Sequence, residues 1–320
     1  MNHSTVKSFT FGIGLFFTLP LVYGNSSSPS SSDGTLYINK SKTHKVAPVK
    51  YGFHYEEIGM MGEGALHAEL IRNRSFEEAT PPAGLSVKNG LYENVPAPRV
   101  KEKKVFQADP LIGWTTYPLS YTPVFISRTD ENPMSGENKY SMLVNVTEDI
   151  ANHPDALILN RGYYGMNLKT DTSYRLSLFL KNRNYSAPLR VFLVDEWGQR
   201  VSNVIEVNVG NRDWTKYTGE LKPEKNVRRG MFAIQPMSKG QFQIDVVSLF
   251  PSDTWNDGKS VFRKDIVQNL KEFSPSFIRF PGGCIVHGVN EETMYHWKKT
   301  LGPIENRPGQ WSKWAPYYRT

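Results

Sequence analysis

The sequence predicts a mixed fold in which an α/β unit is interrupted by an inserted antiparallel β-sandwich. Two patterns favour the α/β unit: a short strand that ends in carboxylates at 51–59, and an amphipathic helix at 259–273 followed by a strand at 277–280. The residues between these parts form short strand-like runs separated by turn residues, without a helical period, and so favour the sandwich. The 320 residues suffice for about two domains.

The beginning of the chain has the pattern of an exported protein. Residues 1–24 predict a signal peptide, because the basic Lys7 precedes an apolar run that ends at Tyr23. The alternative is an uncleaved anchor, for which the interrupted run is short. The serine-rich residues 25–34 predict a flexible linker. We therefore expect a secreted or periplasmic protein. With one cysteine, Cys284, it has no internal disulfide and needs sizeable cores for stability.

Charge and histidine spacing argue against several classes of partner. The net charge is +7, but the basic residues are scattered rather than gathered in a stripe. The seven histidines lack the spacing of metal ligands. We therefore expect no nucleic-acid or membrane partner, no metal and no other cofactor. Glycosylation sequons, which matter only if the host glycosylates, begin at Asn39, Asn73, Asn145 and Asn184.

Residues 35–79 form the first part of the predicted α/β domain. A short strand ends in Glu56 and Glu57, and residues 62–76 predict a helix with apolar side chains near one face. Adjacent residues of a strand point to opposite sides, so at most one of these glutamates can face a given pocket. The alternative is that both are ordinary surface charges.

Residues 80–250 form the predicted insert, which begins at a proline- and glycine-containing boundary. We expect strands at 140–146, 174–181, 189–194, 204–209, 230–235 and 242–249. Aromatic side chains on a β-sandwich can stack on sugar rings, although packing in the core or at an edge is the commoner role of any single one. The aromatic residues concerned are Trp114, Tyr163, Tyr164, Trp197, Trp214 and Tyr217.

Residues 251–320 resume the α/β domain. The helix at 259–273 is followed by a strand, 277–280, which we expect to be buried and which stops at a Pro-Gly-Gly turn. A charge on a buried strand needs a partner, and polar residues near the carboxyl ends of parallel barrel strands face the active site. Arg279 therefore marks a candidate active-site mouth, or alternatively an ordinary structural ion pair. The aromatic run that ends at Thr320 shows no obvious stop, so we expect a fragment.

Several stretches support a comparison with a known family. In chain order they are 51–58, 68–77, 279–284, 297–303 and 307–309. Together they resemble the α-L-arabinofuranosidases of glycoside hydrolase family 51. The resemblance covers about 40–80 and 250–320, while the insert more loosely resembles the carbohydrate-binding-module-like sandwich of the plant-type and Bacteroides-type branch.

The resemblance implies a (β/α)8 TIM barrel that carries the insert as a jelly roll. It also implies retaining hydrolysis by two carboxylates about 5 Å apart, one acid/base and one nucleophile. In the family these two glutamates lie at the ends of the fourth and seventh barrel strands. We therefore expect no catalytic carboxylate within this chain, and expect both beyond Thr320.

The resemblance also assigns supporting roles to residues of this chain. Glu56 matches the glutamate that binds the arabinose hydroxyls. Arg279 matches the arginine that keeps the nucleophile ionised by charge pairing. Cys284 matches a residue at the sugar pocket. Trp314, and less closely Trp311, match a tryptophan that lines this pocket.

The first functional hypothesis is a secreted α-L-arabinofuranosidase that releases terminal arabinofuranose from arabinan- or arabinoxylan-type plant polysaccharides. This chain is then its N-terminal fragment and inactive alone, and an oligomer of the complete enzyme is compatible with the hypothesis. The second hypothesis is a glycan-binding module without hydrolytic activity. The third is a non-functional piece, which follows if two barrel strands cannot bury their faces.

Overall fold

A computed structural model describes most of the 320 residues. The described residues are 38–41, 43, 45, 51–58, 60–80, 86–89, 91–95, 104–107, 109–288, 291, 293–311 and 318–319. The predicted signal peptide, the serine-rich linker and Trp314 lie outside them. The chain divides into two units, 1–50 and 51–320, of which the second contains every element discussed below. Within the described part, no helix is both long enough and apolar enough to cross a membrane.

The described structure is mostly β, with few helices, as the sequence predicts in outline. The strands are β1 (Phe53–His54), β2 (Ser86–Lys88), β3 (Leu91–Val95), β4 (Lys104–Gln107), β5 (Trp114–Tyr117), β6 (Val124–Thr129), β7 (Ser141–Val146), β8 (Leu157–Asn160), β9 (Met166–Leu168), β10 (Tyr174–Asn182), β11 (Pro188–Val194), β12 (Ile205–Asn208), β13 (Thr215–Leu221), β14 (Val227–Pro236), β15 (Gly240–Pro251), β16 (Ile278–Arg279), β17 (Gln310–Trp311) and β18 (Tyr318–Arg319). The helices are α1 (Lys264–Glu272), α2 (Cys284–His287) and three short 3-10 helices, η1 (Ile150–Asn152), η2 (Trp297–Thr300) and η3 (Ile304–Asn306).

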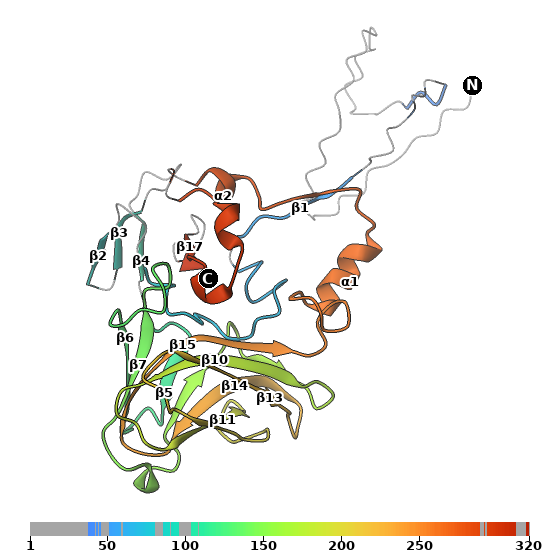
Figure 1. Ribbon diagram of the computed structural model, residues 1–320. Helices are drawn as coiled ribbons and strands as arrows, with labels where there is room; N and C mark the ends of the chain where they lie inside the picture. Colours follow the sequence, from blue (N-terminus) through green and yellow to red (C-terminus); the bar gives the residue numbers. More distant parts are fainter. Residues whose placement is uncertain are drawn as a thin grey trace. The chain divides into compact units, whose positions relative to one another are not determined.

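Two antiparallel sheets pack face to face between β5 and β15 (Figure 1). One has five strands in the order β13-β10-β15-β7-β6, and the other has six, with β12-β11-β14-β8-β5 in a row and β9 beside β14. Side chains of both sheets share one hydrophobic core, in which Leu178, Phe232 and Phe242 are fully buried. All six strands predicted in this region are confirmed, as β7, β10, β11, β12, β14 and β15. Two smaller antiparallel sheets contain β2-β3-β4 and β17-β18.

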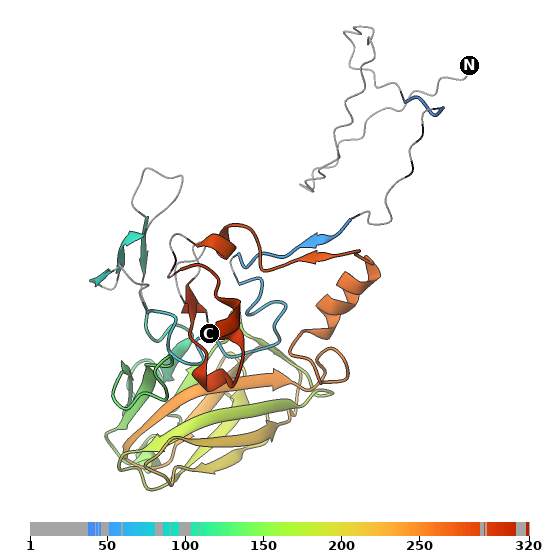
Figure 2. The same ribbon diagram turned by 45° about the horizontal axis from the view of Figure 1, so that its top comes forward.

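A separate parallel pair joins the two ends of the predicted α/β domain. β1 and β16 pair in parallel, with Phe53 opposite Ile278 and His54 opposite Arg279. Figure 2 shows the two strands side by side, with α1 next to β16. Along the chain, β1 is followed by the two antiparallel sheets, then by α1 and then by β16. The helix predicted at 259–273 is present as α1, shortened at its start because residues 255–262 form turns.

The expectation of a buried strand at 277–280 is wrong. Phe277, Ile278 and Phe280 are all exposed, and so is Arg279. A parallel strand is buried when strands flank both edges and helices cover both faces. Here β1 and β16 form a sheet of two strands, and α1 has no buried residue. The apolar sequence is present, but little of the described structure covers it.

The helix predicted at 62–76 is also wrong, because these residues form turns, bridges and extended chain. Asn73 and Phe76 have positive φ angles of 52° and 61°, which an α-helix does not contain. The apolar side chains of this segment pack on the sandwich instead, and Ile71 and Phe76 belong to its hydrophobic core. Tertiary packing thus overrides the local helical pattern.

Backbone hydrogen bonds fix the same segment to the sandwich. The Leu70 N–H donates to the Leu249 carbonyl at 3.1 Å, and the Val247 N–H donates to the Arg74 carbonyl at 2.9 Å. Both partners lie on β15, which leads directly back to α1. The segment after β1 and the strand before α1 are therefore held together, so the two ends of the predicted insert lie at one place.

Candidate functional site

Glu56 follows β1, and its carboxylate turns toward the loop after β16. Its Oε1 atom accepts a hydrogen bond from the Ile285 N–H at 3.2 Å, and its Oε2 atom lies 3.9 Å from His54 Nε2. The Glu56 side chain is only 14% exposed. Because β1 and β16 run in parallel, their carboxyl ends meet at one edge, and the carboxylate lies at that edge.

The Pro-Gly-Gly turn fits closely around this carboxylate. Gly282 has a φ of +141°, and a Cβ atom there would lie 2.4 Å from Glu56 Cγ, so this position requires glycine. A Cβ atom on Gly283 would lie 3.5 Å from Glu56 Oε2 and 3.9 Å from Arg279 Nη2. Cys284, a half-buried free cysteine, comes next and begins α2. The structure therefore brings Glu56, Arg279 and Cys284 to one turn.

Glu57 is engaged elsewhere. Its Oε2 atom accepts hydrogen bonds from the Gly62 N–H and, at 3.4 Å, from the Tyr55 hydroxyl. The two adjacent carboxylates thus have different partners, as the alternation of side chains along a strand predicts. Glu56 is the one at the Pro-Gly-Gly turn.

Arg279 has no carboxylate partner among the residues that the structure describes. The alternative role of Arg279 was an ordinary structural ion pair. No such pair occurs in the described part of the chain. The side chain is exposed, and its guanidinium group borders Gly283. A planar group of five N–H donors is therefore free to hold a carboxylate at this edge.

The six aromatic residues of the insert divide into different environments. Trp114 is buried in the core, with its Nε1 donating to the Asn73 carbonyl at 3.1 Å, and Trp214 Nε1 donates to the Asn132 carbonyl at 3.0 Å. In contrast, Tyr164 is 83% exposed and Trp197 is 68% exposed. The packing role therefore holds for Trp114, and the two exposed rings remain as candidates for binding.

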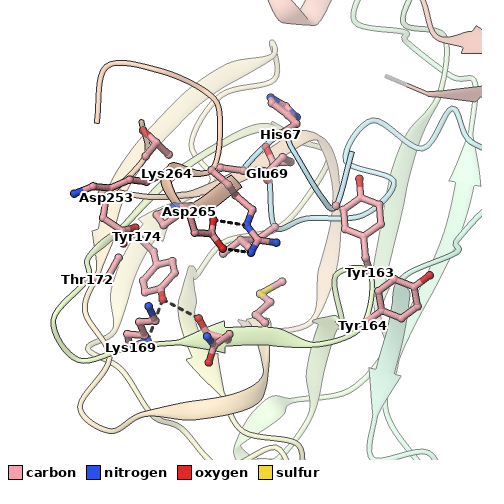
Figure 3. A pocket seen from close by; sticks show the side chains of 18 of the residues that line it. His67, Glu69, Tyr163, Tyr164, Lys169, Thr172, Tyr174, Asp253, Lys264 and Asp265 are labelled. Carbon is pink, nitrogen blue, oxygen red and sulfur yellow. Dashed lines mark hydrogen bonds and ion pairs between the residues drawn. The ribbon is translucent and has the colours of Figure 1, made fainter. Parts of the chain in front are cut away.

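Outside the Pro-Gly-Gly turn, a cavity of about 730 Å³ lies where the segment after β1, the loop before β9, the end of β15 and the start of α1 meet (Figure 3). Figure 3 shows Tyr163 and Tyr164 at one edge of this cavity and Asp253 and Lys264 at another. Burial, together with the charges of Arg74 and Arg307, lowers the pKa of the lining residue His67 to about 4. The sequence did not indicate this cavity, because its lining comes from segments far apart in the chain.

Glu69 is the buried charge beside this cavity. Its carboxylate accepts hydrogen bonds from the Ile71 N–H at 3.0 Å, the Leu249 N–H at 2.8 Å and the Ser248 hydroxyl at 2.6 Å. Arg74 Nη1 lies 3.8 Å from it, and both side chains are almost fully buried. Burial raises the pKa of Glu69, while Arg74 and the hydrogen bonds oppose this. These contacts anchor the segment to the sandwich, so we regard Glu69 as structural although it also lines the cavity.

The other predicted site residues are less defined. Trp311 lies in β17, and Trp314 falls outside the described residues. No cluster of three or more histidine, cysteine, aspartate or glutamate residues suited to a metal ion occurs in the part of the chain that the structure describes.

Comparisons with known proteins agree with one another. The family described as Alpha-L-arabinofuranosidase 1 domain matches residues 269–320. Alpha-L-arabinofuranosidase 1 of Arabidopsis thaliana is 28% identical over 274 residues, which are 83% of this chain and 36% of that protein. The extracellular exo-alpha-L-arabinofuranosidase of Streptomyces chartreusis is 26% identical over 83% of this chain and 29% of that protein. A probable alpha-L-arabinofuranosidase A of Aspergillus flavus is 26% identical over 96% of this chain and 42% of that protein.

A solved structure shares the fold. It is the arabinose-bound MgGH51 α-L-arabinofuranosidase, with a TM-score of 0.69 and 24% sequence identity, covering 87% of this chain and 41% of that one. The chain thus spans well under half the length of the proteins to which it is similar.

Proposed function

We propose, because the chain resembles the α-L-arabinofuranosidases of glycoside hydrolase family 51, that it is the N-terminal part of a secreted enzyme of this type. The similar proteins carry this name, and one is named as extracellular and exo-acting. The complete enzyme releases terminal arabinofuranose from arabinan- or arabinoxylan-type polysaccharides with retention of configuration. Residues 1–24 are its signal peptide and 25–34 a linker.

The parallel pairing of β1 with β16 carries this proposal. These strands come from opposite sides of the insert, yet they share one register and end at one edge, where Glu56 and Arg279 lie. Carboxyl ends of parallel strands carry the active site in (β/α)8 barrels. We assign the pair as the first two strands of such a barrel, formed by 35–79 and 251–320, with 80–250 as an inserted jelly roll.

The exposed apolar side chains of this region support the barrel assignment. Phe277, Ile278 and Phe280 on and around β16 are exposed, as is Phe273 at the end of α1. A soluble protein rarely leaves such a group of large apolar side chains uncovered. In the complete protein the remaining strands and helices of the barrel cover them.

The residues at the turn have distinct roles in this proposal. Glu56, held by the Ile285 N–H, accepts hydrogen bonds from the arabinose hydroxyls. Arg279 pairs with the nucleophilic carboxylate and keeps it ionised at neutral pH. Cys284 lies at the sugar pocket, and Trp314 lines it. None of these four side chains forms or breaks a covalent bond.

The two catalytic carboxylates lie in sequence that follows Thr320. In a retaining glycosidase they stand about 5 Å apart, one as acid/base and the other as nucleophile. By the resemblance they come from the fourth and seventh barrel strands, whereas β1 and β16 provide two strands. The 320-residue chain alone therefore lacks the nucleophile and does not hydrolyse an arabinofuranoside.

Hydrolysis of an aryl α-L-arabinofuranoside tests the proposal. The complete protein should release the aryl group, and the 320-residue chain should not. In the complete protein, Arg279→Lys should lower kcat and Arg279→Ala should lower it further, because lysine lacks the planar fork and alanine lacks the charge. The acidic limb of the pH–rate profile should move to higher pH as the nucleophile's pKa rises. Turnover by the 320-residue chain, or an unmoved acidic limb in Arg279→Ala, contradicts these assignments.

A second function, glycan binding by the insert without hydrolysis, is favoured by one observation. Tyr164 and Trp197 are both strongly exposed on the sandwich. Exposed aromatic rings are suited to stacking on the apolar faces of sugars. This function is compatible with the first, since one chain can carry both a catalytic domain and a binding domain.

A further inference from the structure

We propose that Trp197, Tyr164 and the arginine pair Arg228–Arg229 form a binding groove on the sandwich for a glycan that carries uronic acid residues. The groove is a hollow of about 620 Å³, lined by these four residues together with Asp195, Glu196, Lys225, Asn226 and Val227. The choice of a glycan as ligand rests on the proposed carbohydrate function of the chain. The argument for the groove itself rests on its geometry and charges.

Trp197 is held on a rigid turn although its ring is exposed. The nearly buried carboxylate of Asp195 accepts hydrogen bonds from the Trp197 N–H at 3.2 Å and the Gln199 N–H at 2.9 Å. The same carboxylate pairs with Lys225 Nζ at 3.1 Å. Gly198, with a φ of +82°, completes the turn. The backbone of this turn is therefore ordered before a ligand binds, which lowers the entropic cost of binding there.

Tyr164 lies on a second ordered loop at the same hollow. The loop is closed by a hydrogen bond from the Gly165 N–H to the Arg161 carbonyl at 3.0 Å. Gly165 has a φ of +88°, and a Cβ atom there would lie 3.0 Å from Arg229 Cα, so glycine allows the loop to pass directly over β14. Tyr164 and Arg229 are thereby brought together, although they are far apart in sequence.

Single exposed aromatic residues on a surface need no explanation, but two at one hollow are informative. Tyr164 is 83% exposed and Trp197 is 68% exposed, so neither ring contributes much to the sandwich core. Binding pockets combine such aromatic surfaces with a few polar groups that orient the ligand. The polar groups of this hollow come from the turn at Asp195 and from the strand that begins at Val227.

The charges of the hollow indicate an acidic sugar. Lys225 and Asp195 neutralise each other, whereas neither Arg228 nor Arg229 has a carboxylate partner within the described residues. Arg228 and Arg229 are adjacent in β14, but the register of β14 against β9 shifts between Val227 and Gly230, so both residues can line the hollow. Two guanidinium groups suit the charge of a uronic acid carboxylate. Glu196 adds an acceptor for sugar hydroxyls. A strand of nucleic acid also binds through arginine and aromatic rings, but its closely spaced phosphates would meet the carboxylate of Glu196.

The groove extends beyond this hollow. Tyr164 also lines the cavity of about 730 Å³ shown in Figure 3, so the two hollows share this residue. The larger cavity provides further polar groups at Lys169 and Asp253. Two neighbouring hollows that share Tyr164 offer more binding surface than one sugar needs, which favours a chain of several sugars over a monosaccharide.

The test measures binding of the 320-residue chain to a matched pair of polymers by isothermal titration calorimetry at low salt. The first polymer is glucuronoxylan, which has uronic acid branches, and the second is the same polymer after chemical reduction of its carboxyl groups. We expect binding to glucuronoxylan and clearly weaker binding to the reduced polymer. Added salt should weaken the first interaction, because exposed charges are screened.

Variants then locate the site. Trp197→Ala should raise the Kd for both polymers by at least about tenfold, because a central aromatic anchor carries much of the binding energy. The double variant Arg228→Gln, Arg229→Gln should reduce glucuronoxylan binding to the level of the reduced polymer. The controls are Tyr121→Ala and Arg190→Gln, an exposed tyrosine and an exposed arginine elsewhere on the sandwich, which should change nothing.

Four results overturn the inference: no binding of either polymer, equally tight binding of both polymers, an unchanged Kd in Trp197→Ala, or tighter binding of a single-stranded DNA oligonucleotide than of glucuronoxylan. Circular dichroism of each variant checks that the fold is kept. These outcomes are independent of the proposed hydrolase activity, which is measured on the complete protein with an aryl arabinofuranoside. If that assay fails while glucuronoxylan binding is intact, the proposed hydrolase activity is refuted and the proposed binding groove is retained.

Discussion

Replacing Glu69 by alanine should destabilise the sandwich strongly, because this carboxylate connects the segment after β1 to β15. The substitution removes the acceptor for the Leu249 N–H, the Ile71 N–H and the Ser248 hydroxyl. It also leaves the buried guanidinium group of Arg74 without the carboxylate that lies 3.8 Å away.

The expected loss follows from burial. The Glu69 and Arg74 side chains are 2% and 8% exposed. Removing one partner of a buried ion pair costs about 3–5 kcal/mol of unfolding free energy, since the remaining charge has neither water nor partner. For a domain of this size that corresponds to a fall in Tm of about 10 °C. Glu69→Gln should lose less, because its amide oxygen can still accept from the backbone N–H groups.

Urea unfolding followed by tryptophan fluorescence measures this loss, since Trp114 lies in the core. The matched control is Glu206→Ala, which removes the carboxylate of an exposed pair that lies 3.2 Å from Arg190 Nε. We expect less than about 1 kcal/mol there, because water and salt screen exposed pairs. If Glu69→Ala costs no more than Glu206→Ala, Glu69 is not the anchor and the reasoning from burial fails.

Three further predictions concern pH and the boundary of the insert. Burial, with a smaller contribution from a nearby glutamate, raises the pKa of Asp245 in the folded protein. The stabilisation that Asp245 contributes is therefore present below about pH 4 and is lost as the pH rises through its pKa in the folded protein. In Asp245→Asn this decline of Tm with rising pH should disappear. Burial lowers the pKa of His67 to about 4, so the pH dependence of its contribution to stability is reversed. This stabilisation is present above about pH 6.5 and is lost as the pH falls toward 4. Between pH 6.5 and 4 the Tm of His67→Phe should therefore fall less than that of the unmodified protein. A segment of residues 64–251 should melt cooperatively, and at a higher temperature than a segment of residues 85–250, because only the longer segment contains the core residue Phe76. Equal melting temperatures of the two segments would show that Phe76 is dispensable.

The strands of the sandwich could be predicted from the sequence because their pattern is local. Runs such as 174–181 and 242–249 combine alternating apolar residues with flanking turn residues, and both appear as β10 and β15. The pairing of the strands could not be predicted in the same way. It depends on contacts such as that between β10 and β15, which bring together residues far apart in the chain.

The segment at 62–76 shows why local patterns fail. Its apolar residues have helical spacing, but Ile71 and Phe76 are buried on the sandwich. Burying these side chains stabilises the segment more than helical propensity does. The buried charges of Glu69 and Arg74 agree with this outcome, since they need fixed partners rather than a solvated helix face. From sequence alone these partners on β15 are not visible.

The candidate site was partly predictable. The Pro-Gly-Gly turn and the alternation of Glu56 and Glu57 indicated where a carboxylate could lie, and the structure places Glu56 against Gly282. The exposure of Arg279 was not expected, because the sequence of the strand is apolar, whereas β16 pairs only with β1 in the described structure. The groove at Trp197 combines two loops and one strand, so only the aromatic residues themselves were foreseeable.

Comparison of Glu56→Gln with Glu57→Gln in the complete protein tests the central claim most directly. Both variants keep the side-chain shape and remove one charge, but Glu56 lies at the Pro-Gly-Gly turn and Glu57 is hydrogen-bonded to Gly62. For an aryl α-L-arabinofuranoside we expect kcat/KM to fall about 100-fold or more in Glu56→Gln and to stay within about threefold in Glu57→Gln, since only Glu56 contacts the sugar in the proposed site. Equal losses in the two variants, or near-normal kcat/KM in Glu56→Gln, would contradict the placement of an arabinofuranose site at the ends of β1 and β16.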